Sequence, residues 1–87
     1  MAWQIRITRT AEKQINALDR TVQTRVVKSL REIMSAENPR RSGKELKGNK
    51  AKLWRYRVGD YRIICDINDS EKKLSVLEVA HRKEVYR

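Results

Sequence analysis

Two strand-like runs joined by a Gly-Asp pair constrain the fold of this chain more than any other feature. Residues 53–58 and 61–68 are rich in aromatic and β-branched side chains, and Gly59-Asp60 stands between them. Such a pair between strand-like runs predicts a β-hairpin with a two-residue turn. A turn of this length fixes the register, so it also predicts which residues lie opposite each other.

The predicted register sorts the hairpin side chains into two faces of different character. Side chains alternate along a strand, so one face holds only apolar and aromatic residues, in the pairs Val58 with Tyr61, Tyr56 with Ile63, and Trp54 with Cys65. The other face has Arg57 opposite Arg62, and Arg55 opposite Ile64. Two arginines directly opposite each other repel. We therefore expect an anion between Arg57 and Arg62; the alternative is that both are solvated and splay apart.

The remaining segments predict two helices and two further strands. Residues 3–8 alternate as a strand, Thr10 is a suitable N-cap for a short helix, and a longer amphipathic helix begins near Arg20. Residues 40–52 are polar and basic, as in an exposed loop, and residues 74–80 form a last strand without clean alternation. The expected fold is α+β in the order β-α-α-β-β-β. Both helices pack on one face of a mostly antiparallel four-stranded sheet, and the opposite face is open and basic.

The charge of the chain indicates the kind of partner it binds. The 87 residues, taken as a single domain over 1–87, carry 21 Lys and Arg against 11 Asp and Glu, a net charge of +10. Segment 40–62 alone has nine cations and two acids. Such an excess favours a phosphate backbone, an anionic membrane or an acidic protein. With no long apolar stretch, no signal-peptide pattern and a single cysteine, we expect a cytoplasmic protein that does not enter a membrane.

Metal or two-histidine chemistry finds little support in the sequence. His81 is the only histidine, and scattered carboxylates give no ligand cluster, so neither a metal nor another cofactor is expected. Guanidinium groups bind phosphate oxygens without metal. Arg82 and Tyr86 could reach the open face, although the direction of both side chains stays open. Tyr86 is then either an acid or base with a pKa shifted by neighbouring cations, or a packing residue.

Three segments resemble the RelE/ParE superfamily of bacterial type II toxins, and more closely its RelE branch. They are Leu46-Lys47-Gly48, residues 53–64 and residues 79–87, of which the last is the most diagnostic. The resemblance covers almost the whole chain and implies the fold given above. It also implies a ribosome-dependent endoribonuclease that cleaves mRNA in the A site by attack of the 2′-hydroxyl, without metal, and so inhibits translation and growth.

The resemblance further implies roles for individual residues. Arg62, Arg82 and Tyr86 match the family's catalytic arginines and tyrosine, whereas Arg55 and Arg57 stand where well-known members carry lysines. Arginine stays protonated and cannot be a general base. We therefore expect Tyr86 to be the base, Arg62 and Arg82 to stabilise the phosphorane, and Arg55 and Arg57 to clamp the backbone. Contacts to RNA and the ribosome are expected from Lys44, Lys47, Lys50, Lys52, His81 and Lys83.

The partners implied by the resemblance are the ribosome with its rRNA, the mRNA, and an acidic antitoxin of the RelB kind. Two other functions stay open. One is a ParE-like toxin that binds DNA gyrase and does not cut RNA, and the other is a non-catalytic RNA- or DNA-binding module. The combination of Arg62 with Arg82 and Tyr86 favours the nuclease over the ParE-like toxin, and a binding module would show binding that weakens steeply with salt but no cleavage.

Overall fold

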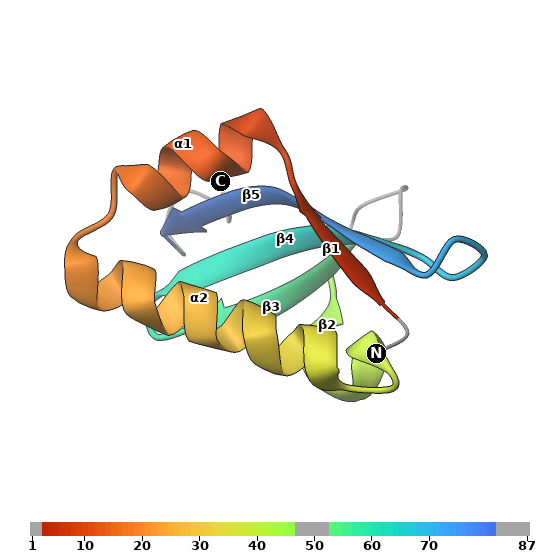
Figure 1. The fold of residues 1–87 in the computed structure, drawn as a ribbon. Coiled ribbons are helices and arrows are strands. Elements are labelled where there is room, and N and C mark those ends of the chain that lie inside the picture. The colour runs from red at the N-terminus through yellow and green to blue at the C-terminus, as the bar shows by residue number, and fades with distance from the viewer. Residues whose placement is uncertain (1–2, 47–52, 82–87) are drawn as a thin grey trace.

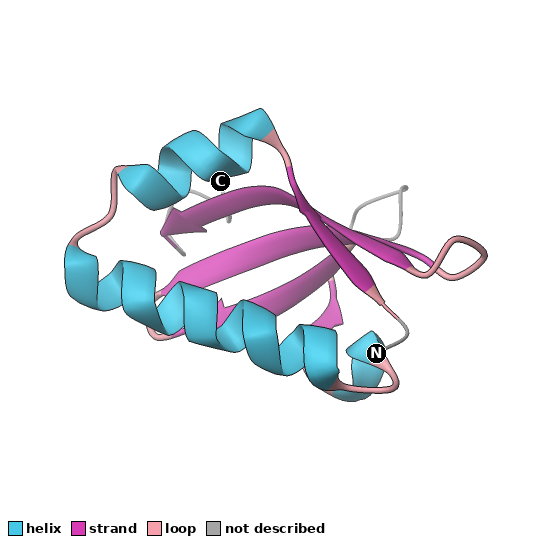
Figure 2. Cartoon of the chain, viewed as in Figure 1, coloured by secondary structure: helices cyan, strands magenta, loops and turns pink. Residues whose placement is uncertain are grey.

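A computed structural model describes residues 3–46 and 53–81 of the chain (Figure 1). In chain order the elements are β1 (Gln4–Ile7), α1 (Arg9–Asn16), α2 (Arg20–Ser35), the 3-10 helix η1 (Pro39–Arg41), β2 (Lys44–Glu45), β3 (Trp54–Val58), β4 (Tyr61–Asn68) and β5 (Lys73–His81). Both α-helices lie on the same face of one sheet (Figure 2). This confirms the predicted α+β class and the packing of the helices.

The sheet has five strands, in the order β1-β5-β4-β3-β2. β1 runs parallel to β5 and all other neighbours are antiparallel, so the prediction of a mostly antiparallel sheet is confirmed. The predicted number of four strands is wrong, because Lys44 and Glu45 pair with Arg55 and Trp54 as an additional edge strand. Two polar residues are too few to give an alternation signal, so this strand was expected to be loop.

The β3–β4 hairpin has the predicted register at all five pairs. Val58 lies opposite Tyr61 and Arg57 opposite Arg62, with Gly59 and Asp60 forming the turn. The φ angle of Gly59 is 59°. Among the described non-glycine residues only Lys72 has a positive φ, so the positive angle falls on the first turn position alone. This pattern belongs to a type II′ turn, whose twist matches that of the two strands.

The first helix begins earlier than the sequence predicts. Thr8, and not Thr10, is the N-cap of α1: its Oγ1 accepts a hydrogen bond from the Ala11 amide at 3.3 Å. The same hydroxyl donates to the carbonyl oxygen of Val76 at 2.8 Å. Because Thr8 both ends β1 and holds it against β5, the chain turns into the helix directly after the strand. The Asp19 carboxylate caps α2 through the Val22 amide at 2.9 Å.

A β-bulge explains why the last strand did not alternate cleanly. Ile64 lies opposite Glu78 but Cys65 lies opposite Val76, so Leu77 is the extra residue and the phase of β5 changes there. Beyond the bulge, the amide of Val79 donates to Oε1 of Gln14 on α1 at 2.6 Å. The helix therefore satisfies a strand amide next to the irregularity.

The core lies between the helices and the sheet. α1 and α2 contribute Ala11, Val26, Leu30 and Ile33, and the sheet contributes Tyr56, Val58, Ile63, Cys65, Leu74, Val76 and Val79. Trp54, Tyr56, Val58, Ile63 and Cys65 come from the apolar face predicted for the hairpin, and they pack in or against this core. The arginines of the hairpin consequently point to the sheet's other face.

Candidate functional site

The candidate site is built around two arginines on neighbouring strands. Arg57 of β3 lies directly opposite Arg62 of β4, and the next residue of the same face on β3, Arg55, lies opposite Ile64. Arg57 is exposed, Arg55 is half-buried, and Arg62 is only 7% exposed. Burying a guanidinium is costly unless it is compensated by polar or anionic groups. Three positive charges therefore lie close together on this face, and burying the one on Arg62 costs free energy of folding.

A pocket of about 610 Å³ adjoins these arginines. It lies where α2, the segment from η1 to β2, and the hairpin meet. Its lining residues are Ser29, Glu32, Ile33, Ala36, Pro39, Arg41, Ser42, Gly43, Lys44, Arg55, Tyr56, Arg57 and Arg62. Five of these residues are cations and one is an acid. A concave site of this charge is suited to an anionic ligand that also presents some apolar surface.

The segment from Pro39 to Lys44 forms one wall of the pocket, and two hydrogen bonds to its carbonyl groups hold it in place. The hydroxyl of Tyr56 donates to the carbonyl oxygen of Pro39 at 2.6 Å, and Nε1 of Trp54 donates to that of Ser42 at 2.8 Å. Burial raises the pKa of Tyr56, so its hydroxyl stays protonated and keeps donating. Both bonds fix the segment that carries Arg41 and Lys44 beside β3.

Arg40 makes an ion pair and a cation–π contact that attach η1 to the sheet. Nη1 of Arg40 lies 2.8 Å from Oδ1 of Asp69, in the β4–β5 turn. The Arg40 guanidinium also lies 6.0 Å from the centre of the Trp54 ring. Arg40 therefore links η1 to two other parts of the fold and does not line the pocket.

Gly43 is required where β2 approaches β3. Its φ is +79°, and a Cβ at this position would lie 2.3 Å from the carbonyl oxygen of Arg55 and 2.6 Å from Nε1 of Trp54. Only a residue without a side chain fits there. The close approach brings Lys44 next to Arg55 and closes this side of the pocket.

His81 is separated from the arginines. It pairs with Tyr61 across β4 and β5, and the two rings meet edge-on at 5.4 Å between centroids. Tyr61 shares its face with Val58, on the side of the helices, whereas Arg62 pairs with Ala80 on the other side. The structure therefore places His81 on the opposite face of the sheet from Arg57 and Arg62, and its expected contact with RNA or the ribosome stays a prediction.

Several predicted site residues lie outside the described residues: Lys47, Lys50, Lys52, Arg82, Lys83 and Tyr86. Of the remaining ones, Lys44 joins Arg55, Arg57 and Arg62 at the pocket. Sequence reasoning missed Glu32 and Arg41 as pocket residues. Arg41 belonged to the basic segment already noted, but no signal in the sequence brings Glu32 of α2 near the hairpin.

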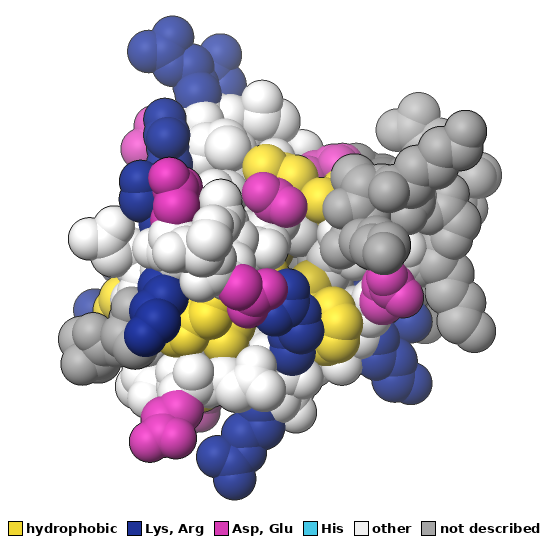
Figure 3. Space-filling view, turned by 90° about the vertical axis from the view of Figure 1, so that its right-hand side faces the viewer, with side chains coloured by type: hydrophobic (Ala, Val, Ile, Leu, Met, Phe, Trp, Pro, Cys, Tyr) yellow, Lys and Arg dark blue, Asp and Glu magenta, His cyan; other side chains and the backbone are white. Residues whose placement is uncertain are grey.

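No group of three or more His, Cys, Asp or Glu within residues 3–46 and 53–81 could hold a metal ion. None of the described helices is long and apolar enough to cross a membrane. At the end of the molecule shown in Figure 3, basic and acidic side chains alternate around exposed apolar atoms, unlike the lining of the pocket.

The chain is similar to known toxins along almost its full length. Residues 5–86 match the family described as the ParE toxin of the type II toxin-antitoxin system parDE. Toxin RelG of Mycobacterium tuberculosis is 32% identical over 87 residues, which cover 100% of this chain and 99% of the relative. Toxin RelE of the same organism is 28% identical over 85 residues, 98% of this chain and 87% of the relative.

Solved structures agree with the sequence relatives. The RelE–RelB complex of Pyrococcus horikoshii has a chain with a TM-score of 0.77 and 25% identity, over 94% of this chain and 97% of that one. A mutant of the Escherichia coli toxin RelE in the free state also gives 0.77, with 26% identity over 99% of this chain and 92% of that one. Family, relatives and fold agree, and the chain therefore belongs to the RelE branch of the RelE/ParE superfamily of type II toxins.

Proposed function

We propose that this toxin is a ribosome-dependent endoribonuclease that cuts mRNA in the A site. The observation that carries the proposal is the opposed pair Arg57 and Arg62 at a pocket with five cations. An RNA phosphate placed between the two guanidinium groups would relieve their repulsion and receive hydrogen bonds from both. The RelE relatives support the same assignment.

The proposed reaction uses the RNA's own 2′-hydroxyl. Its oxygen forms a bond to the adjacent phosphorus while the bond from phosphorus to the 5′-oxygen breaks. The leaving oxygen takes a proton from solvent water, so the products are a 2′,3′-cyclic phosphate and a 5′-hydroxyl. Tyr86 accepts the proton of the 2′-hydroxyl, since an arginine cannot. Arg62 and Arg82 stabilise the negative charge that develops on the phosphorane oxygens. Arg55 and Arg57 hold the flanking backbone, and Lys44 contributes to the RNA-binding charge.

An acidic antitoxin of the RelB kind is the proposed protein partner. The relative from Pyrococcus horikoshii is described in complex with RelB. The net charge of +10 of this chain favours binding to an acidic polypeptide. Covering the arginine face with carboxylates would compete directly with RNA, so one surface would serve both activity and inhibition.

A purified translation reaction tests the proposed activity. Message is added with the toxin, and 5′ ends are mapped by primer extension. We expect cuts within the A-site codon that are lost in Arg82→Ala and slowed at least 100-fold in Tyr86→Phe. A-site cleavage by Tyr86→Phe at the wild-type rate would remove this residue as the base.

Gyrase inhibition is the second candidate, because the matching family is described by its ParE toxin. The two functions separate in one pair of assays. Intact message together with arrested DNA supercoiling by gyrase would establish the ParE-like function. Salt-sensitive RNA binding with neither effect would leave a non-catalytic binding module.

A further inference from the structure

The solvent face of α2 carries a second set of cations, away from the arginine site. Arg20, Thr24, Lys28 and Arg31 follow one another at spacings of four, four and three residues, which puts them on one stripe of the helix. All four are exposed. Together with Gln23 and Val27 they line a shallow depression of about 510 Å³. We call the four residues the α2 stripe.

The charge of the α2 stripe is not balanced on the helix. Glu32 is the only acid within Arg20–Ser35, and it lines the pocket next to the hairpin arginines. Lys28 stands four residues before Glu32, yet the two form no ion pair, and neither Arg20 nor Arg31 forms one with any described residue. Helices exposed to solvent usually carry acidic and basic side chains three or four residues apart, so that opposite charges are neighbours. Three neighbouring cations that form no ion pair with any described residue give a local positive field.

The α2 stripe and the arginine site face different directions. α2 covers the apolar face of the sheet through Val26, Leu30 and Ile33, and the stripe lies on the helix surface turned away from that face. Arg57 and Arg62 lie on the sheet's other face. A segment of nucleic acid bound at the α2 stripe is therefore not the segment that is bound at Arg57 and Arg62.

We propose that the α2 stripe binds the phosphate backbone of structured RNA. Given the nuclease proposed above, on which this inference rests, that RNA belongs to the ribosome, and the arginine site is left to the message. From residue 20 to residue 31 the helix axis rises about 16 Å, a length over which a nucleic-acid strand presents several phosphates. Binding at two faces would make the proposed cutting depend on the ribosome and not on message alone.

The side chains of the stripe favour RNA over an acidic helix of a protein partner. Docking an amphipathic helix needs apolar anchors at spacings of three and four residues. Val27, 40% exposed, is the only large apolar residue of the depression. Two arginines, a lysine and a threonine instead match phosphate oxygens, which accept hydrogen bonds and carry charge.

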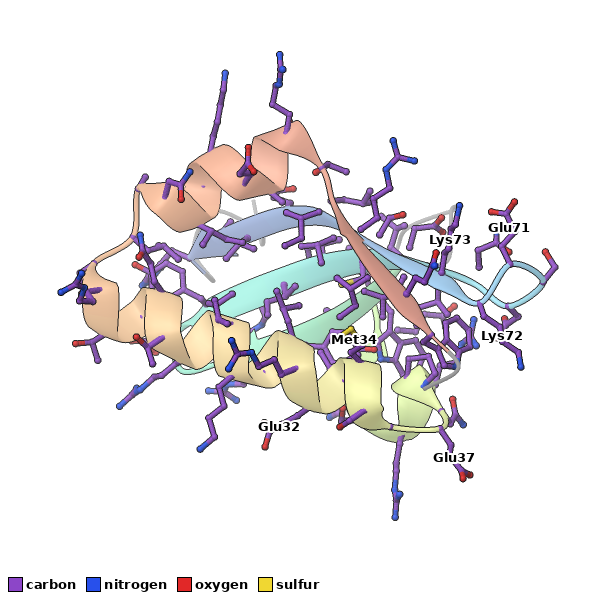
Figure 4. The ribbon with its side chains drawn as sticks, viewed as in Figure 1. Glu32, Met34, Glu37, Glu71, Lys72 and Lys73 are labelled. Carbon is purple, nitrogen blue, oxygen red and sulfur yellow. The ribbon has the colours of Figure 1, made fainter. Side chains whose placement is uncertain are left out.

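Salt-dependent binding to purified 70S ribosomes tests the inference, with co-sedimentation as the readout. Lys28→Gln/Arg31→Gln removes two charges and keeps good helix formers. Lys13→Gln/Lys72→Gln removes the same charge outside the stripe, from α1 and from the β4–β5 turn, where Figure 4 shows Lys72. We expect the stripe variant to bind more weakly, with a slope of log affinity against log salt shallower by roughly 1.5 to 2, and the control to keep the wild-type slope.

Equal slopes for the two variants would overturn the inference, as would a wild-type protein that does not bind ribosomes. The outcome is separable from the proposed nuclease activity. Cleavage by the wild type with no change of slope in Lys28→Gln/Arg31→Gln would refute the stripe alone. A changed slope without any cleavage would refute the nuclease alone. The saturated complex of the stripe variant should cut at the wild-type rate, because its arginine site is intact.

Discussion

Arg57 and Arg62 face each other across β3 and β4, one exposed and the other almost fully buried. Like charges in directly opposed positions destabilise a sheet. A fold selected for stability alone would place an opposite charge or an uncharged residue at one of the two positions. On the proposed function, the pair lowers the stability of the free protein and raises its affinity for the RNA phosphate.

Replacing the exposed member should stabilise the free toxin. We expect Arg57→Gln to raise the free energy of unfolding by about 0.2–1 kcal/mol at low salt, because it removes the cross-strand repulsion. The gain should shrink at high salt. Urea unfolding measures it, with Arg6→Gln as the control, since Arg6 lies opposite Ser75 on the edge strand β1 and has no cation directly opposite. A lower stability of Arg57→Gln than of the wild type at low salt would argue against the repulsion.

Two glycines with positive φ should respond very differently to alanine. Gly43→Ala places a Cβ 2.3 Å from the carbonyl oxygen of Arg55, so the backbone must shift. Gly59→Ala meets nothing nearer than Nη1 of Arg25 at 3.9 Å, so only the cost of the backbone angle is left. We expect losses in urea unfolding of about 1 kcal/mol for Gly59→Ala and of roughly 3 kcal/mol or more for Gly43→Ala. Equal losses would show that the close approach of β2 to β3 is not rigid.

The single cysteine should be unreactive while the protein is folded. Cys65 is buried in the core, and burial raises the pKa of its thiol to about 12. At neutral pH the reactive thiolate is then almost absent. We expect alkylation by iodoacetamide to be far slower than for a free cysteine, and to become fast once urea unfolds the chain. Fast alkylation in native buffer would contradict the burial of Cys65.

The Arg40–Asp69 ion pair should make a small, pH-dependent contribution to stability. The hydrogen bond from Arg40 lowers the pKa of Asp69. A carboxyl with a depressed pKa contributes stability above its unfolded pKa of about 3.9, and the contribution is lost as the pH falls through the lower, folded value. Asp69→Asn should therefore be slightly less stable than the wild type at pH 7 and equal to it in strong acid. Thermal melts of both proteins at a series of pH values measure the difference, and a constant difference at every pH would contradict this assignment.

Features of the fold that depend on residues close together in the sequence were predictable, whereas features that depend on distant residues were not. The turn at Gly59-Asp60 fixes five cross-strand pairs through local geometry alone, and all five were predicted. The phase of β5 was not, because it depends on a bulge at Leu77. That bulge is supported by contacts such as the one from Gln14, which is distant in sequence. Strand β2 exists only because Gly43 lets two polar residues approach β3.

The candidate site shows the same division. Arg57 and Arg62 were placed together from strand alternation, since both belong to one hairpin. For His81 no face was predicted, and the alternation of β5 beyond its bulge puts it beside Tyr61, on the face opposite the two arginines. Glu32 and Arg41 reach the pocket through the packing of α2 and η1 against β3. Such tertiary neighbours leave no periodic pattern in the sequence.

In the proposed reaction, Arg62 acts on the RNA phosphate during cleavage. Its most direct test is the single-turnover rate of A-site cleavage on ribosomes programmed with message, at saturating toxin. Arg62→Gln is compared with the wild type and with Lys72→Gln, which changes a charge in the β4–β5 turn. We expect a rate at least 100-fold lower for Arg62→Gln and an unchanged rate for Lys72→Gln. Cleavage by folded Arg62→Gln at the wild-type rate would contradict it.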